Sequence, residues 1–473
     1  MIKCGRHLKN VNRKKIDVDP ISAPVLAFSS YLGMVPVEGK LVDEKTLVLN
    51  KSIKIGRTNF TFKIIDATKH NLNPESNSYS IAYLSTLAPM TCDLKINALN
   101  FRIIVALRRA LAVLDNQALL EQQTDDQLVR LNNMALFTEP ELQVFIAESE
   151  DASLISQVLE DTPVSRNDVM SVYHKFVNKN GAVDVMFHIV NFLRFLYESI
   201  GHVGLGTKNN KIFAVVNVAN FDNAYWDGSC ITIGNGDTML NNLCSVDIIS
   251  HELSHALVDQ LGGLIYQGES GMLNESFADV FGCIYESYIY QKFNADANPD
   301  NDLLGEFDYL VGEDAAIGLK ALRDMENPEQ GLYPQPRSYK GEYWPTGSDD
   351  NGGVHTGSSV GNRCFYLISA RKGMLVAIRW FYDCLRGLPK NSSYSAFATR
   401  LYLVSRQNVV CKESLQEVSI PFSSKIPKRR NFRRLKQTKL RLAHFETARA
   451  EHEQAKTASR FASSRRQRET PFS

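Results

Sequence analysis

Residues 251–279 read HELSHALVDQLGGLIYQGESGMLNESFAD. The stretch opens with H-E-x-x-H, which on a helix places His251 and His255 about one turn apart on the same face. Two imidazoles in this position can bind one zinc ion, with Glu252 beside them. Glu275, on a second expected helix, is the candidate third ligand. Three protein ligands leave a fourth position open, which is typical of catalytic rather than structural zinc sites.

The motif also has an ordinary alternative. A chance H-E-x-x-H is expected in roughly one chain in a hundred of this length, and histidines on an apolar helix face are often core residues. Here the motif lies in an amphipathic run that includes Ile248, Ile249, Leu253 and Leu257. This context favours zinc binding.

Composition restricts the class of protein. The 473 residues are 44% hydrophobic and 22% charged with a net charge of +1, which is typical of a globular protein with a large core. The charge points to neither a nucleic-acid nor a membrane partner, and no apolar run reaches 18 residues. The eight cysteines contain no C-x-x-C pair and are expected to be buried thiols.

Periodicity predicts the remaining elements. The chain is expected to be β-rich from 20 to about 90. Helices are expected at 101–133, 166–177 and 183–200, and strands at 212–218 and 231–233. No catalytic constellation precedes residue 140, so this region is expected to be a pro-segment or an accessory region.

Three separated motifs resemble the thermolysin-like metallopeptidases: Asn223-Ala224-Tyr225-Trp226, the 251–279 stretch, and Asp350-Asn351-Gly352-Gly353-Val354-His355. The resemblance covers roughly residues 180–410. It implies an α+β fold with a mixed α/β N-terminal lobe, a mostly helical C-terminal lobe and the zinc helix between them. The expected parts are 1–140 (pro-segment or accessory), 141–262 (N-terminal catalytic lobe), 263–424 (helical lobe) and 425–473 (basic tail).

The resemblance implies a zinc-dependent endopeptidase. Its ligand set is two histidines and a glutamate, so the assignment of Glu275 rests on that precedent. Glu252 would take a proton from a zinc-bound water and deliver it to the leaving amine. Asp279 would accept the second ring N–H of His251 and so fix its tautomer.

Three further residues match the family's catalytic groups. His355 and Tyr266 would donate hydrogen bonds to the tetrahedral oxyanion, and Asp350 would orient His355. Outside this context, His355 would be a structural histidine and Tyr266 a packing residue.

The family's substrate-binding groups also have counterparts. Arg323 would bind a substrate carbonyl, although a surface salt bridge is its plain alternative. Asn223 and the Ala224 carbonyl would hold the peptide as an added strand. The residues expected to line the pocket after the cut bond are Ile248, Val311 and Leu322. All three are apolar, which predicts cleavage before Leu, Phe or Ile.

Calcium is a second implied metal. The carboxylates at the family's calcium positions are Asp247, Glu286, Asp308 and Glu313. Leu310 stands where one more acid would be needed for a double site, so one structural calcium ion is expected beside one catalytic zinc ion.

The chain departs from the family pattern at two places. Gly357 replaces the asparagine usual after His355-Thr356, and from about residue 412 the family's last helix is no longer recognisable. Residues 425–473 hold 15 Lys/Arg against 4 Asp/Glu. They are expected to be a solvated tail, with nucleic-acid binding as the less favoured alternative.

The expected partners are protein or peptide substrates, with a monomeric protein made as a zymogen. The family implies secretion, although the N-terminus shows no apolar signal region, which leaves another export route or a cytoplasmic location open. The sequence leaves two alternative functions: a zinc-binding protein of the same fold that acts by binding, and a zinc hydrolase of non-peptide substrates. The presence of the zinc ligands, the base and the oxyanion donors argues against the first, and the presence of Asn223 and Arg323 argues against the second.

Overall fold

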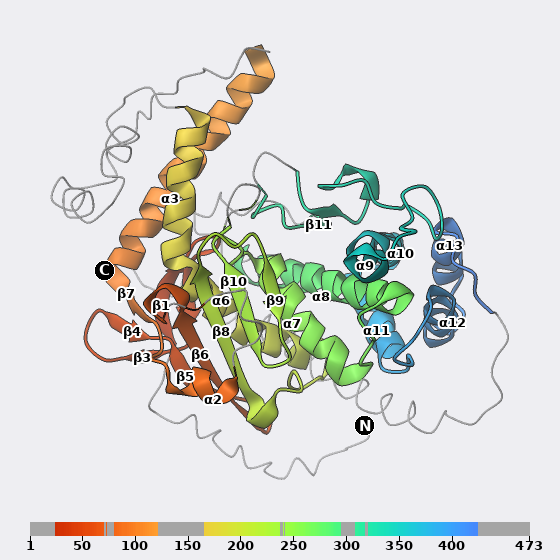
Figure 1. Cartoon of the computed structure of the whole chain (residues 1–473), viewed down its shortest axis with the longest axis horizontal. Coiled ribbons are helices and arrows are strands. Elements are labelled where there is room, and N and C mark those ends of the chain that lie inside the picture. Colours follow the sequence, from red (N-terminus) through yellow and green to blue (C-terminus); the bar gives the residue numbers. More distant parts are fainter. Residues whose placement is uncertain are drawn as a thin grey trace, which may run out of the picture. The chain divides into compact units, whose positions relative to one another are not determined.

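The computed structural model describes residues 24–70, 72, 80–121, 165–236, 240, 242–294, 308–316 and 320–423. All of these belong to one compact unit, Met1–Ser423, whose elements are labelled in Figure 1. The basic tail forms the other unit, Ser424–Ser473, and lies outside the described residues.

The main sheet has five strands in the spatial order β5-β6-β8-β10-β9. The bounds are β5 Asn50–Ile55, β6 Thr58–Asp66, β8 Lys211–Val218, β9 Ala224–Trp226 and β10 Cys230–Gly234. The central strands β6, β8 and β10 run parallel, and β8 reads as a near-continuous apolar run because both of its faces are covered. The short strand β9 pairs antiparallel with β10 and forms one edge.

Smaller sheets precede and flank this one. Their strands are β1 Val25–Ser29, β2 Gly33–Val37, β3 Lys40–Leu41, β4 Thr46–Val48 and β7 Thr91–Asp93. The β-rich prediction for residues 20–90 is thus confirmed in the described part. Because β5 and β6 share a sheet with β8, the expected boundary near residue 140 falls between strands of one sheet and does not separate two folded parts. Whether residues 1–140 are removed stays a prediction.

Helix α6 (Arg166–Ile200) is continuous, so the predicted break between 177 and 183 is wrong. Gly181 lies inside the helix, where a Cβ atom would be only 2.8 Å from Cys244 Sγ. The glycine therefore permits close packing and does not end the helix. The other helices before the motif are α1 Ala67–His70, α2 Ile81–Thr86, α3 Leu94–Glu121 and the short η3 Lys208–Asn210.

The motif helix α7 (Val246–Leu261) packs along α8 (Gly268–Asn294), and Figure 1 shows both in the middle of the described unit. Two short strands, β11 Leu310–Val311 and β12 Arg323–Asp324, and η5 Pro328–Gln330 follow. The helical part consists of α9 Asp349–Gly357, α10 Ser359–Lys372, α11 Met374–Leu385, α12 Tyr394–Val404 and α13 Val409–Glu417. Helices α9 to α12 all contact α8, so α8 is the link between the two parts.

The architecture confirms the predicted fold class, a mixed α/β part followed by a helical part. Among the helices that the structure describes, none is both long and apolar enough to cross a membrane.

Candidate active site

The H-E-x-x-H motif lies on α7, and most residues of this helix are buried. Ser245 is its N-cap residue, but its hydroxyl donates to Asp247 Oδ1 at 2.6 Å and does not cap a backbone N–H. His251 and Glu252 are buried, and His255 is half-buried. Apolar neighbours at 248, 249, 253 and 257 hold the helix in the core, which fixes the direction of the three polar side chains.

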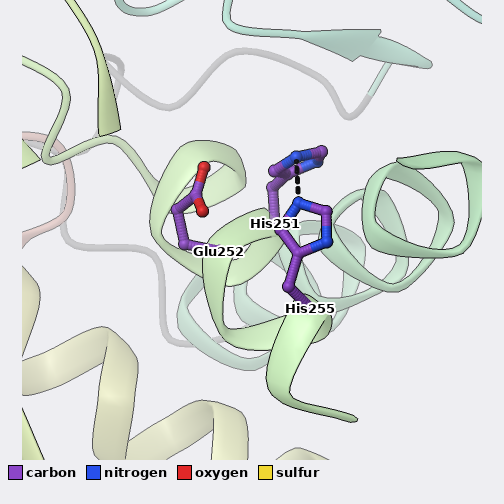
Figure 2. A group of neighbouring side chains, drawn as sticks. All are labelled: His251, Glu252 and His255. Carbon is purple, nitrogen blue, oxygen red and sulfur yellow. Dashed lines mark hydrogen bonds between the residues drawn. The ribbon is translucent and has the colours of Figure 1, made fainter. Parts of the chain in front are cut away.

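The two imidazoles meet one carboxylate from α8. His251 Nε2 and His255 Nε2 lie 3.1 Å apart, and a dashed line joins the two rings in Figure 2. Glu275 Oε2 is 3.4 Å from His251 Nε2, and Glu275 Oε1 is 3.4 Å from His255 Nε2. The structure therefore brings together the three predicted zinc ligands.

These distances fit a zinc ion. Ligands about 2.0–2.1 Å from a tetrahedral zinc ion are themselves about 3.3–3.4 Å apart. In addition, Glu275 Oε2 is buried without a hydrogen-bond partner among the described residues. A buried carboxylate oxygen with no partner is costly. A cation bound between Glu275 and the two rings would supply the missing partner.

Asn274 of α8 orients the His255 ring through a hydrogen bond. The Nδ1–H of His255 donates to Asn274 Oδ1 at 2.9 Å, and Asn274 in turn donates to the Leu264 carbonyl. Since Asn274 offers an acceptor there, the Nε2 lone pair of His255 is left for a metal. Sequence reasoning missed Asn274, although its position directly before Glu275 could have indicated it.

Asp279 lies beside His251, and its predicted role as acceptor of the second ring N–H stays a prediction. Its Oδ1 lies 2.8 Å from His251 Nδ1, although the angle is not that of a hydrogen bond. Burial lowers the pKa of His251, but Asp279 and Glu275 outweigh it and raise that pKa to about 10. Burial raises the pKa of Asp279, whereas Arg323 and His251 together hold it below its usual value.

Glu252 lies beside the ligands without forming part of their set. One of its carboxylate oxygens is within 4.8 Å of a ring nitrogen of both His251 and His255. Figure 2 shows the three side chains together on α7. Glu275 is closer to both rings than Glu252 is, which is the geometry expected of Glu275 as the third ligand. Burial raises the pKa of Glu252, and the neighbouring His251 and His255 oppose that rise.

Tyr266 and His355 both contact Glu275. The Tyr266 hydroxyl makes a short hydrogen bond to Glu275 Oε1 and is 3.3 Å from His355 Nε2. Both side chains remain partly exposed, at 39% for the Tyr266 residue and 49% for the His355 side chain. They are therefore accessible to a substrate.

The turn before His355 is built from four consecutive residues with positive φ, Asp350 to Gly353. Asp and Gly tolerate this conformation better than most residues. The turn brings Asp350 onto His355, where Oδ1 accepts from Nδ1–H at 2.6 Å and Oδ2 from the backbone N–H at 2.9 Å. Gln335, which sequence reasoning missed, donates to the His355 carbonyl at 3.0 Å.

The predicted substrate-binding residues come from α7 and from the segments at β9, β11 and β12. Arg323 Nη2 donates to Asp279 Oδ1 at 2.6 Å, and its Nε is buried without a hydrogen-bond partner among the described residues. Asn223 Oδ1 accepts from the Ala224 N–H at 2.9 Å, and Ala224 begins the edge strand β9. Ile248 and Val311 are buried and Leu322 is half-buried.

A second acidic group surrounds the start of α7. Asp247, Glu286, Asp308 and Glu313 interact electrostatically, and so does Asp314, which sequence reasoning missed. Burial and the neighbouring carboxylates raise the pKa of Glu286 well above its usual value and that of Glu313 to about 12. The Oε2 atoms of Glu286 and Glu313 are buried without hydrogen-bond partners among the described residues. Hard oxygen donors of this kind suit calcium.

Gly357, where the family pattern has a side chain, packs against α8. A Cβ atom at residue 357 would lie 2.4 Å from Met272 Sδ, and Met272 is buried. The thioether thus occupies the space of the missing side chain.

The fold has a sheet-containing part, a helical part and two central helices that direct two histidines and a glutamate to one point. This combination defines the class of two-part metallopeptidase folds. Comparison with known sequences agrees. The family described as thermolysin metallopeptidase, catalytic domain, matches residues 120–259, and its alpha-helical domain matches residues 262–425. Because these matches cover more than half of the sequence, the chain belongs to the thermolysin metallopeptidase family. The expectation that the resemblance ends near residue 412 is wrong, since α13 lies within the matched range.

Two relatives show the extent of the likeness. Thermolysin of Alicyclobacillus acidocaldarius is 37% identical over 191 residues, 40% of this chain and 32% of that protein. The extracellular metalloprotease of Pectobacterium carotovorum is 35% identical over 38% of this chain and 53% of its own length. The match therefore spans about a third to a half of these relatives. A solved structure, the precursor of protealysin from Serratia proteamaculans, is 27% identical and covers 51% of this chain and 78% of its own, with a TM-score of 0.43.

Proposed function

We propose that the protein is a zinc-dependent metalloendopeptidase. The observation that carries this proposal is the spacing of 3.1–3.4 Å among His251 Nε2, His255 Nε2 and the Glu275 carboxylate. Membership of a metallopeptidase family supports it.

Zinc, held by these three side chains, would supply Lewis acidity. It would lower the pKa of a water molecule, so that the water can lose a proton and attack a carbonyl carbon. Glu252 takes the proton of the attacking water and returns it to the leaving amine. Its buried position and raised pKa suit a group that must both accept and release a proton near neutral pH.

The developing oxyanion receives hydrogen bonds from Tyr266 and His355. The contact of His355 Nδ1 with Asp350 fixes the ring so that Nε2 points toward Tyr266 and Glu275. In the imidazolium form, Nε2–H is a charged donor, which strengthens the hydrogen bond.

The substrate backbone adds to the edge of β9, held by Asn223 and the Ala224 carbonyl, while Arg323 binds a substrate carbonyl. Apolar Ile248, Val311 and Leu322 receive the residue after the cut bond. Cleavage before Leu, Phe or Ile follows from their apolar character.

The central test is Glu252→Gln, which keeps the shape of the side chain and removes the base. Casein hydrolysis is expected to fall by about 10²–10⁴-fold while zinc content stays at one ion per chain. Asp259→Asn, an exposed change on the same helix, is the matched control and should leave both unchanged. Normal hydrolysis by Glu252→Gln would exclude the mechanism.

The second candidate is a zinc-binding protein of the same fold that acts only by binding. Full zinc content without turnover on any peptide would favour it. The presence of the base and both oxyanion donors favours the enzyme.

We also propose one structural calcium ion, bound by Asp247, Glu286, Asp308 and Glu313 with Asp314 nearby. The raised pKa values and unpartnered oxygens of this acidic group support the proposal. Calcium at 100 times its Kd should stabilise the fold by about 2.7 kcal/mol, which would be measured as a rise in Tm over a magnesium control. Glu286→Gln should reduce that rise.

The remaining features follow from the family. We propose protein or peptide substrates, a monomer, synthesis as a zymogen and secretion, because one relative is named an extracellular metalloprotease.

A further inference from the structure

Asp279 is a carboxylate that three side chains approach. Its Oδ1 faces His251 Nδ1 at 2.8 Å and accepts from Arg323 Nη2 at 2.6 Å, while Oδ2 accepts from Asn362 Nδ2 at 2.7 Å. His251 and Arg323 belong to the metal and substrate sites described above. Asn362 belongs to neither, and it comes from α10 in the helical part.

The Asn362 amide has one hydrogen bond in the described structure, and that bond goes to Asp279. The residue is 1% exposed, and its Oδ1 is buried without a partner among the described residues. Rotating the amide by 180° would place Oδ1 against the carboxylate and would leave both groups without a donor. The free-energy cost of burying the Asn362 amide is therefore offset only at its NH2 group, which donates to Asp279.

The neighbouring glycine makes this contact possible. A Cβ atom at Gly361 would lie 2.2 Å from Ser276 Oγ and 2.8 Å from Ser276 Cβ, so α10 approaches α8 as closely as a glycine permits. Ser276 lies on α8 less than one turn before Asp279. At this separation the short Asn362 side chain reaches the carboxylate, which a wider spacing would prevent.

We propose that Asn362 is a positioning residue of the metal centre. By holding Oδ2, it fixes the plane of the Asp279 carboxylate so that Oδ1 stays against His251 and keeps that ring directed at the metal position. The helical part of the chain would thereby set the zinc affinity of a site whose ligands lie on α7 and α8. The inference rests on the proposed zinc function.

The test is Asn362→Leu, which keeps the volume and removes the donor. Zinc dissociation constants would be measured by chelator competition on the full chain. Asp279→Asn, which alters the direct partner of a metal-binding histidine, should weaken binding about 10–100-fold. Asn362→Leu, one contact further away, should weaken it by about 3–10-fold. It should also shift the visible absorption of the cobalt-substituted protein, because the His251 ring changes orientation.

Asn191→Leu is the matched control. Asn191 is also buried, on α6, and its amide donates to the Phe187 carbonyl at 2.9 Å. This change should cost stability without changing zinc affinity or the cobalt spectrum. If Asn191→Leu weakens zinc as much as Asn362→Leu, the effect is general and the positioning role is excluded.

Other outcomes are equally decisive. Wild-type affinity and an unchanged cobalt spectrum in Asn362→Leu would overturn the inference, whereas failure of the unaltered protein to bind zinc would overturn the proposed function itself. If Asn362→Leu does not fold, Gly361→Ala replaces it. That change separates α10 from α8 and should weaken zinc in the same direction, and unchanged affinity would again overturn the inference.

Discussion

His355 combines a partly exposed side chain with a fixed direction. Asp350 holds its Nδ1, and Gln335 and Ser358 hold its carbonyl, so the ring can serve a substrate without a rearrangement of the backbone. It is not among the three ligands that converge within 3.4 Å of one another. Loss of this side chain should therefore reduce catalysis without reducing metal binding.

We expect His355→Ala to lower kcat by about 10²–10³-fold, because one hydrogen-bond donor to the oxyanion is lost. Zinc content should remain at one ion per chain. Peptide hydrolysis under saturating substrate and metal analysis of the same sample would measure both. A fall in zinc content parallel to the fall in kcat would show that the residue supports the metal instead.

Asp184 is a buried acid remote from the proposed chemistry. Its Oδ1 accepts from the Ser30 N–H at 2.9 Å, and its Oδ2 has no partner among the described residues. Burial raises the pKa of Asp184 from about 3.8 to about 7, although hydrogen bonds from Ser29 and Ser30 oppose the rise. Since the folded pKa exceeds the unfolded one, ionisation of Asp184 destabilises the fold as pH rises from about 4 to about 7.

Asp184→Asn should remove this effect. The difference in unfolding free energy between variant and wild type should grow from pH 4 to pH 7 and then stay constant, reaching on the order of 3 kcal/mol. Urea unfolding at several pH values would measure it. A difference that does not vary with pH would show that Asp184 ionises normally.

At the scale of elements, helix packing depends on pairs of residues whose sizes match. Gly357 at the end of α9 and Met272 on α8 form such a pair, since Met272 fills the space that a side chain at 357 would occupy. Neither residue alone indicates the match, which explains why Gly357 looks like a simple departure in the sequence.

Gly357→Asn should destabilise the fold by about 1–3 kcal/mol through overpacking, and Met272→Ala should do so by about 2–5 kcal/mol through a cavity. The double variant should lose less than the sum of the two, with a coupling of roughly 0.5–3 kcal/mol. Denaturant unfolding of all four proteins would measure this cycle. Strict additivity would mean that the two side chains do not share space.

The sequence predicts elements and sites whose partners are close along the chain. The spacing of His251 and His255 on one helix is enough to propose a metal site, and the family's ligand set adds Glu275. Asn362 and Gln335 come from distant segments, so their roles appear only after packing. At Gly181 the sequence predicts a helix break that does not exist. Glycine often interrupts a helix, but here it lies inside α6 and allows close contact with Cys244.

At the scale of the whole described unit, the N-terminal strands are part of the main sheet. Phe60, Phe62 and Ile64 of β6 are fully buried, and β6 pairs with β8 from Thr61 to Asp66. A proteolytic event that removed all residues before 141 would take two of the five strands away. We therefore expect that activation, if it involves cleavage, leaves these strands in place.

A chain shortened to residues 24–473 should fold and bind zinc, whereas one shortened to residues 141–473 should aggregate or lack a cooperative unfolding transition. The physical reason is the exposed edge of β8 and the lost apolar contacts of β6. Circular dichroism with thermal melting, and zinc content, would compare the two. A stable, zinc-binding 141–473 chain would show that the N-terminal strands are dispensable.

The edge position of β9 also limits which targets can be attacked. In the described part of the sheet, β9 is the outermost strand, with β10 on one side only. A strand edge accepts backbone that is extended and has free amides, so helices and buried strands of a folded target cannot dock there. The rate at which a target protein is cleaved would thus depend on how often a short segment of it unfolds locally. Rigid folded proteins would resist cleavage, whereas loosely folded ones would be cleaved.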